Sequence, residues 1–70
     1  MLEYEMYNGE YFITFNVVAI SENDLTATMA ITCAGKISVQ EIDLQQDENG
    51  LYFEYGPLLE VINIDNFELR

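Results

Sequence analysis

The sequence of 70 residues predicts a single domain, residues 1–70, and a domain of that length buries only about 60% of the surface that its unfolded chain exposes. Thirteen acidic residues stand against two Lys and Arg, for a net charge of −11, but half of the residues are hydrophobic, which excludes a disordered acidic tail. The shortage of cations also excludes direct contact with nucleic acid and with anionic membranes, because the phosphates would be repelled.

The single cysteine and the first residues bear on the cellular compartment. Cys33 has no partner for a disulfide within the chain, and its place in an alternating apolar run predicts a buried small hydrophobe. Residues 1–5 lack the positive start and the apolar segment of a signal peptide, and no apolar run approaches the roughly 18 residues of a membrane span. We therefore expect a cytoplasmic protein.

Alternating apolar and polar residues, rich in β-branched and aromatic types, predict five strands separated by turns. The strands are Leu2 to Tyr7, Glu10 to Ile20, Leu25 to Ala34, Ile37 to Leu44 and Leu51 to Tyr55, and the turns are Asn8-Gly9, Ser21 to Asp24, Gly35-Lys36 and Gln45 to Gly50. The pattern favours an all-β fold, a small antiparallel meander of five to six strands that forms a curled sheet or half-open barrel.

The first hairpin has a strong turn signal. A two-residue type I′ turn at Asn8-Gly9 pairs Tyr7 with Glu10, Met6 with Tyr11 and Tyr4 with Ile13. This pairing gathers apolar side chains on one face and places Glu3 and Glu5 on the other, so the turn and the hydrophobic pattern agree.

The third strand alternates most regularly, with Leu25, Ala27, Met29, Ile31 and Cys33 on one face and Thr26, Thr28, Ala30, Thr32 and Ala34 on the other. A turn at Gly35-Lys36 pairs Met29 with Ile42 and leaves Ile37 and Val39 on the Thr-rich face. The apolar residues therefore change face near Gln40-Glu41, which predicts a β-bulge or sharp bend there.

After Pro57, residues Leu58 to Ile64 suit either a helical turn or a strand. Pro at a first helical position favours the helix, whereas the β-branched residues Val61, Ile62 and Ile64 favour a strand. We expect the strand, with one short C-terminal helical turn as the alternative.

Catalytic and metal-binding groups are scarce. The chain has no histidine, which removes the usual general base and the commonest metal ligand, and its four glycines are isolated at predicted turns. Asp47, Asn49 and Gly50 match three positions of a calcium-binding loop, but Gln45 and Gly56 stand where that loop needs Asp and a bidentate Glu. We expect no enzymatic activity, no cofactor and no metal site.

Charge is the remaining functional feature. Acidic residues two apart on a strand lie about 6.6 Å from one another, comparable to phosphates along a nucleic-acid strand. In size and charge the chain is similar to the nucleic-acid mimics that phages and mobile elements encode against restriction, CRISPR or repair enzymes. This similarity covers bulk properties only and includes no sequence motif.

We therefore expect a non-enzymatic inhibitor or adaptor that binds a basic surface of another protein, such as a channel lined by Arg and Lys in a nucleic-acid enzyme. The expected charged contacts are Glu3, Glu5, Glu10, Glu41 and Asp43, with Tyr7 and Phe12 as candidate aromatic anchors. The alternative is a structural module that associates with itself, as a homodimer or within a larger assembly.

Overall fold

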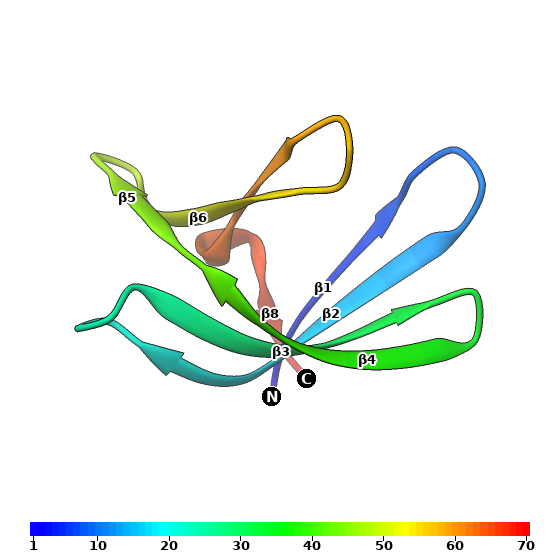
Figure 1. Ribbon diagram of the computed structural model, residues 1–70, viewed down its shortest axis with the longest axis horizontal. Helices are drawn as coiled ribbons and strands as arrows, with labels where there is room; N and C mark the ends of the chain where they lie inside the picture. Colours follow the sequence, from blue (N-terminus) through cyan, green and yellow to red (C-terminus); the bar gives the residue numbers. More distant parts are fainter.

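Eight strands and one 3₁₀ turn make up the computed structural model, which describes residues 1–70 and confirms the all-β, antiparallel class (Figure 1). The elements are β1 (Leu2–Tyr7), β2 (Phe12–Ser21), β3 (Thr26–Cys33), β4 (Lys36–Asp43), β5 (Gln45–Asp47), β6 (Gly50–Tyr55), β7 (Glu60–Asn63), η1 (Ile64–Asn66) and β8 (Glu68–Leu69). They form a five-stranded sheet, in the order β4-β3-β2-β1-β8, and a three-stranded sheet, in the order β5-β6-β7.

The two chain ends lie side by side, because β8 returns to pair with β1 (Figure 1). The amino group of Met1 donates to the carbonyl of Arg70, and the backbone N–H of Arg70 donates to the carbonyl of Met1, each over 2.9 Å. The meander β1 to β4 is thus extended by a short strand from the other end of the chain.

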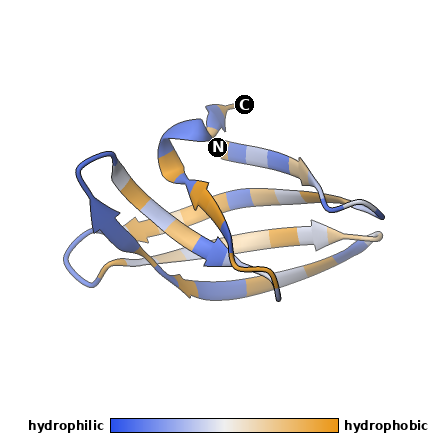
Figure 2. Cartoon of the chain, turned by 90° about the horizontal axis from the view of Figure 1, so that it is seen from above, coloured by the Kyte–Doolittle hydropathy of each residue, from blue (hydrophilic) through white to orange (hydrophobic).

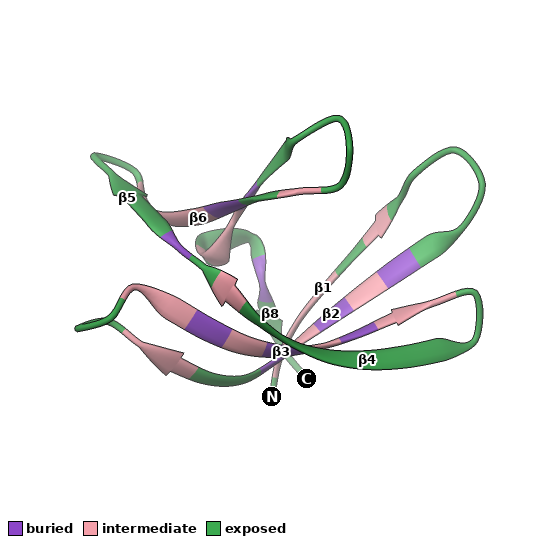
Figure 3. Cartoon of the chain, in the orientation of Figure 1, coloured by how far each residue is buried: buried purple, intermediate pink, exposed green.

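The core lies between the two sheets and takes alternating residues of β2 and β3 together with Phe53 of β6 and Ile62 of β7. Figure 2 shows the matching alternation of hydrophobic and hydrophilic residues along the strands. Phe15 of β2 packs edge-on against Phe53 and Tyr55 of β6, with ring centroids 5.7 and 4.9 Å apart. Buried residues occur in β2, β3, β6 and β7, whereas β4 is exposed along nearly its whole length (Figure 3). The small second sheet therefore covers the five-stranded sheet only in part.

The first turn differs from the prediction by one residue. β1 pairs Tyr7 with Phe12 and Met6 with Ile13, so the turn centres on Gly9-Glu10 and every cross-strand pair shifts by two. A type I′ turn at Asn8-Gly9 requires positive φ at both residues, but only Gly9 has it. The side-chain Oδ1 of Asn8 instead accepts the backbone N–H groups of Glu10 and Tyr11, at 2.9 and 2.8 Å.

The turn between β3 and β4 is displaced in the same way. Cys33 pairs with Lys36, and the turn residues are Ala34 and Gly35, with φ of 53° and 76°. Met29 therefore faces Gln40 rather than Ile42. Cys33, predicted to be buried, is half-buried beside the core.

The predicted bulge near Gln40-Glu41 is wrong. β4 pairs with β3 without interruption, and the irregularity lies in β2 between Val17 and Ala19. No change of face is needed in β4, because Ile37 and Val39 stay on the outer face of an edge strand and remain exposed. The bulge in β2 increases the local twist of the sheet.

The second half of the chain contains more strand than expected. The predicted turn Gln45 to Gly50 includes the short strand β5, and the strand β8 was not predicted. Within Leu58 to Ile64 the strand interpretation is confirmed by β7, and the 3₁₀ turn η1 begins at its last residue.

Candidate functional site

The outer face of the five-stranded sheet carries six of the seven residues expected to contact a partner: Glu3, Glu5, Tyr7, Phe12, Glu41 and Asp43. Cross-strand pairing fixes this arrangement, because Glu5 lies opposite Thr14, Thr14 opposite Thr32, and Glu41 opposite Thr28. The seventh residue, Glu10, lies in the turn between β1 and β2.

The acidic residues on this face form two separate groups. Glu3 and Glu5 belong to β1, whereas Glu41 and Asp43 belong to β4, three strand spacings or about 14 Å away. Between them lies a strip of small and polar side chains, Thr14, Asn16, Thr26, Thr28, Ala30 and Thr32. A partner that touches both groups has to span this strip.

Glu3 is the least available of these carboxylates. Its Oε1 lies 3.2 Å from Nη1 of Arg70, whose Nη2 lies 3.4 Å from Glu68, and the Glu3 side chain is only 24% exposed. The ion pair offsets the charge of Glu3. Of the two carboxylates on β1 that were expected to contact a partner, only Glu5 is therefore free of an ion pair.

Tyr7 and Phe12 are cross-strand partners at the end of the first hairpin. Their ring centroids are 5.0 Å apart, and the residues are 57% and 63% exposed. An exposed aromatic pair of this kind can anchor a protein contact, because it offers apolar area at a low cost in side-chain entropy.

The opposite end of the molecule carries six of the thirteen carboxylates and no Lys or Arg. There the β2–β3 turn and the β5–β6 turn lie on the same side of the molecule (Figure 1), and Glu22 and Asn23 of the first turn line one hollow with Gln46 of β5. We call this region the acidic end and define it by Glu22, Asp24, Glu41, Asp43, Asp47 and Glu48. Asp43 reaches it because its partner on β3 is Thr26, the first residue of that strand.

The carboxylates of the acidic end fall into two kinds. Asp24 and Asp47 shape their turns: Asp24 accepts the hydroxyl of Ser21 at 3.2 Å, and Asp47 accepts the backbone N–H of Asn49 at 2.8 Å. Glu22, Glu41, Asp43 and Glu48 are exposed and take part in no ion pair. These four carboxylates are therefore free to meet an external cation.

Neither cation of the chain lies at the acidic end. Lys36 follows the β3–β4 turn at the other end of the sheet, and Arg70 is held beside Glu3 and Glu68. The acidic end therefore contains negative charge without any neighbouring Lys or Arg.

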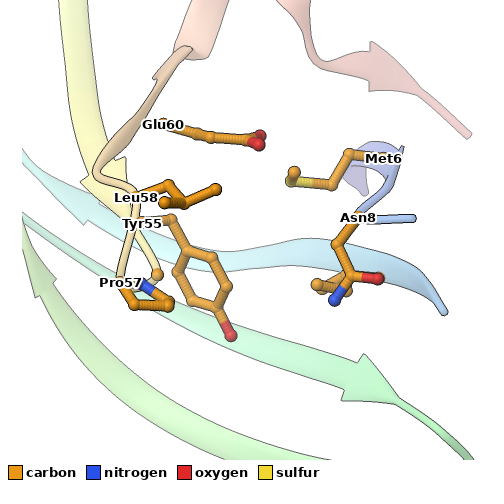
Figure 4. Close-up of a pocket in the computed structure, with 8 residues that line it drawn as sticks. Met6, Asn8, Tyr55, Pro57, Leu58 and Glu60 are labelled. Atoms are coloured by element: carbon orange, nitrogen blue, oxygen red, sulfur yellow. The ribbon is translucent and has the colours of Figure 1, made fainter. Parts of the chain in front are cut away.

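A small apolar hollow lies between the β1–β2 and β6–β7 hairpins (Figure 4). Met6, Asn8 and Ile13 line one side, and Tyr55, Pro57 and Leu58 line the other, with Glu60 beside them. Its volume of about 170 Å³ is below the roughly 300 Å³ at which small-molecule sites begin. It has room for one apolar side chain of a partner.

The sequence contains the acidic turn residues Glu22, Asp24, Asp47 and Glu48, but their grouping was missed. The only local signal is that the two turn segments, residues 21–25 and 45–50, are both acidic. Their proximity depends on how the second sheet lies on the first, which strand alternation does not determine.

Nowhere do three or more acidic or cysteine side chains come together in a way that could hold a metal ion. The structure has no helix with the length and apolar character that a membrane crossing requires. Comparison with known proteins finds no relative: no family model matches the chain, and no curated protein or solved structure is significantly similar to it.

Proposed function

We propose that the protein is a non-enzymatic cytoplasmic binding module that engages a basic surface of another protein, as an inhibitor or nucleic-acid mimic. The observation that supports this proposal best is the acidic end, where six carboxylates of β4 and of the two turn segments lie in one part of the molecule without a Lys or Arg among them. A soluble surface does not require this concentration, because interspersed charges of both signs serve solubility equally well.

Concentrating like charges has a physical cost and a physical use. Twelve of the thirteen carboxylates are exposed on a body with a radius of gyration of 11.6 Å, so self-repulsion opposes the compact state. The same field attracts a cationic surface and accelerates encounter, and it acts over about 8 Å at physiological ionic strength.

The partner that fits best is a protein whose function is to bind phosphates. Glu41 and Asp43 are same-face neighbours on β4, about 6.6 Å apart, and the free carboxylates of the two turns continue the negative surface beyond them. Arg- and Lys-lined channels of restriction, CRISPR or repair enzymes present complementary charge at comparable spacing. The exposed Tyr7–Phe12 pair and the apolar hollow lie at the other end, where they can add contacts to a large partner.

Matched charge variants test this proposal. The first variant, Glu22→Gln, Glu41→Gln and Glu48→Gln, neutralises three carboxylates of the acidic end, and the control, Glu5→Gln, Glu10→Gln and Glu54→Gln, neutralises the same number of exposed glutamates elsewhere. Both change the net charge from −11 to −8. Tagged wild type and both variants are used to capture partners from a bacterial lysate at low and high salt.

We expect the wild type and the control to retain the same basic protein at low salt, with release at high salt. The acidic-end variant should bind that purified partner at least about tenfold more weakly, mainly through slower association. Equal weakening by the two variants would show that only bulk charge matters. Capture that survives 1 M salt, or capture of no basic protein, would overturn the proposal.

A further inference from the structure

β4 is the one long, open sheet edge in this molecule. It forms the outermost strand of the five-stranded sheet and spans eight residues, whereas the other three edge strands, β8, β5 and β7, have two, three and four. Short edges are one way in which proteins avoid pairing with other chains. β4 does not use it.

The side chains of β4 also favour pairing. Ile37 and Val39 are β-branched, lie on the outer face, and are 70% and 69% exposed. The strand contains no proline and no bulge, and no charged residue lies between Lys36 and Glu41. The central part of this edge therefore lacks the usual protection.

The backbone of this edge has free hydrogen-bonding groups. Because Cys33 and Lys36 flank the two-residue turn Ala34-Gly35, they form a hydrogen-bonded pair, and this pattern repeats at every second residue. Lys36, Ser38 and Gln40 therefore bond to β3. The N–H and C=O groups of Ile37, Val39 and Glu41 point away from the sheet.

We infer that a second copy of the chain pairs with this edge, β4 against β4 in antiparallel orientation, to give one ten-stranded sheet per dimer. In the register that we assign, Ile37 lies opposite the partner subunit's Val39, and Ser38 meets the partner subunit's Ser38 at the two-fold axis. This register gathers four β-branched side chains on the outer face and pairs free backbone groups with free backbone groups.

The charges at the two ends of β4 favour antiparallel over parallel pairing. Lys36 lies at one end of β4 and Glu41 and Asp43 lie at the other, so antiparallel pairing brings the basic end of each strand toward the acidic end of its partner. Glu41 lies opposite the partner subunit's Gly35, while Lys36 projects from the other face of the sheet, so the attraction between the two ends acts across the edge and not through a direct ion pair. In the alternative register, Gln40 lies opposite the partner subunit's Gln40 at the two-fold axis. The two Glu41 carboxylates would then be diagonal neighbours, and their repulsion would destabilise the dimer.

The dimer leaves most of the acidic end exposed, because Glu22, Asp24 and Glu48 belong to turns and Asp47 ends β5, all outside β4. Its formation does not depend on the proposed function. The salt dependence of the two interactions is opposite, since salt weakens binding to a basic partner but screens the repulsion between two chains of net charge −11.

A pair of Val→Lys variants tests the interface. Val39→Lys places a charge in the edge, and Val61→Lys makes the same change at an exposed strand residue of the second sheet, where the exposure is 60%. In sedimentation at about 0.5 mM protein, we expect a dimer for the wild type and for Val61→Lys, and a dimer dissociation constant at least about tenfold higher for Val39→Lys. Circular dichroism verifies that both variants are folded.

Cross-linking tests the register. In a Cys33→Ser background, Ser38→Cys should form a disulfide-linked dimer under mild oxidation, because directly opposed residues at a non-hydrogen-bonded site are close enough for a disulfide. Gln40→Cys, on the same face of the same strand, should cross-link at least about tenfold more slowly. A wild type that stays monomeric at about 0.5 mM, equal dissociation by both Val→Lys variants, or faster cross-linking of Gln40→Cys would overturn the inference.

Discussion

Phe15 and Phe12 show how one strand sorts identical side chains. Phe15 is fully buried, and its ring contacts those of Tyr4, Phe53 and Tyr55, with centroids 4.9 to 6.3 Å away. Phe12, three residues earlier on β2, points to the outer face and contacts only the exposed ring of Tyr7. Strand alternation alone separates a core aromatic from a surface aromatic.

Replacing the two phenylalanines should have very different consequences. Phe15→Ala removes the ring at the centre of the aromatic cluster, and we expect it to cost about 3–5 kcal/mol of unfolding free energy. Because a domain of this size has little stability to lose, most of the variant should be unfolded at 25 °C. Phe12→Ala should cost less than about 1 kcal/mol.

Urea denaturation followed by circular dichroism measures both effects. A Phe15→Ala variant as stable as Phe12→Ala would contradict the placement of the core between the two sheets.

At the scale of strands and turns, the faces could be predicted from the sequence but the registers could not. The two predicted two-residue turns, Asn8-Gly9 and Gly35-Lys36, are each displaced by one residue. This shifts the strand pairing by two residues and leaves each side chain on its expected face. The alternation of apolar residues therefore remains correct in either register. The choice between them depends on turn energetics that differ by about 1 kcal/mol, such as the side-chain hydrogen bonds of Asn8.

The short elements were not predictable for a different reason. β5 and β8 have three and two residues, so they are too short to show any periodicity. β8 forms because the chain end returns to β1, where Leu69 lies opposite Leu2. Only the tertiary arrangement specifies such strands.

The turn between β3 and β4 offers a stabilising substitution. Ala34 adopts a φ of 53° in front of Gly35, a left-handed conformation that costs an alanine about 1–2 kcal/mol. Asn tolerates this conformation and is preferred before Gly in type I′ turns, so Ala34→Asn should raise the free energy of unfolding by about 1 kcal/mol.

Ala34→Val is the matched control, because a β-branched residue is strongly disfavoured at positive φ. Thermal unfolding of the three proteins should therefore give the order Asn, Ala, Val from most to least stable. The reverse order would show that the turn does not lie at Ala34-Gly35.

At the scale of the whole molecule, folding places acidic turns that are far apart in the sequence at one end of the structure. Glu22 and Glu48 are 26 positions apart in the chain, yet their turns lie at one end of the structure, while the aromatic pair and the apolar hollow lie at the other. Composition predicts the net charge but not this polarity. Of the residues expected to bind a partner, Glu41 and Asp43 join the acidic end, Glu5 and Glu10 lie away from it, and Glu3 pairs with Arg70.

The most direct measurement of the central claim is a chemical-shift titration of ¹⁵N-labelled protein with a captured basic partner at low salt. We expect the largest changes on the backbone amides of residues 22–24, 41–43 and 47–49, and we expect about 0.5 M salt to reverse them. Changes confined to the first hairpin or to β7, with the acidic end unaffected, would contradict that claim.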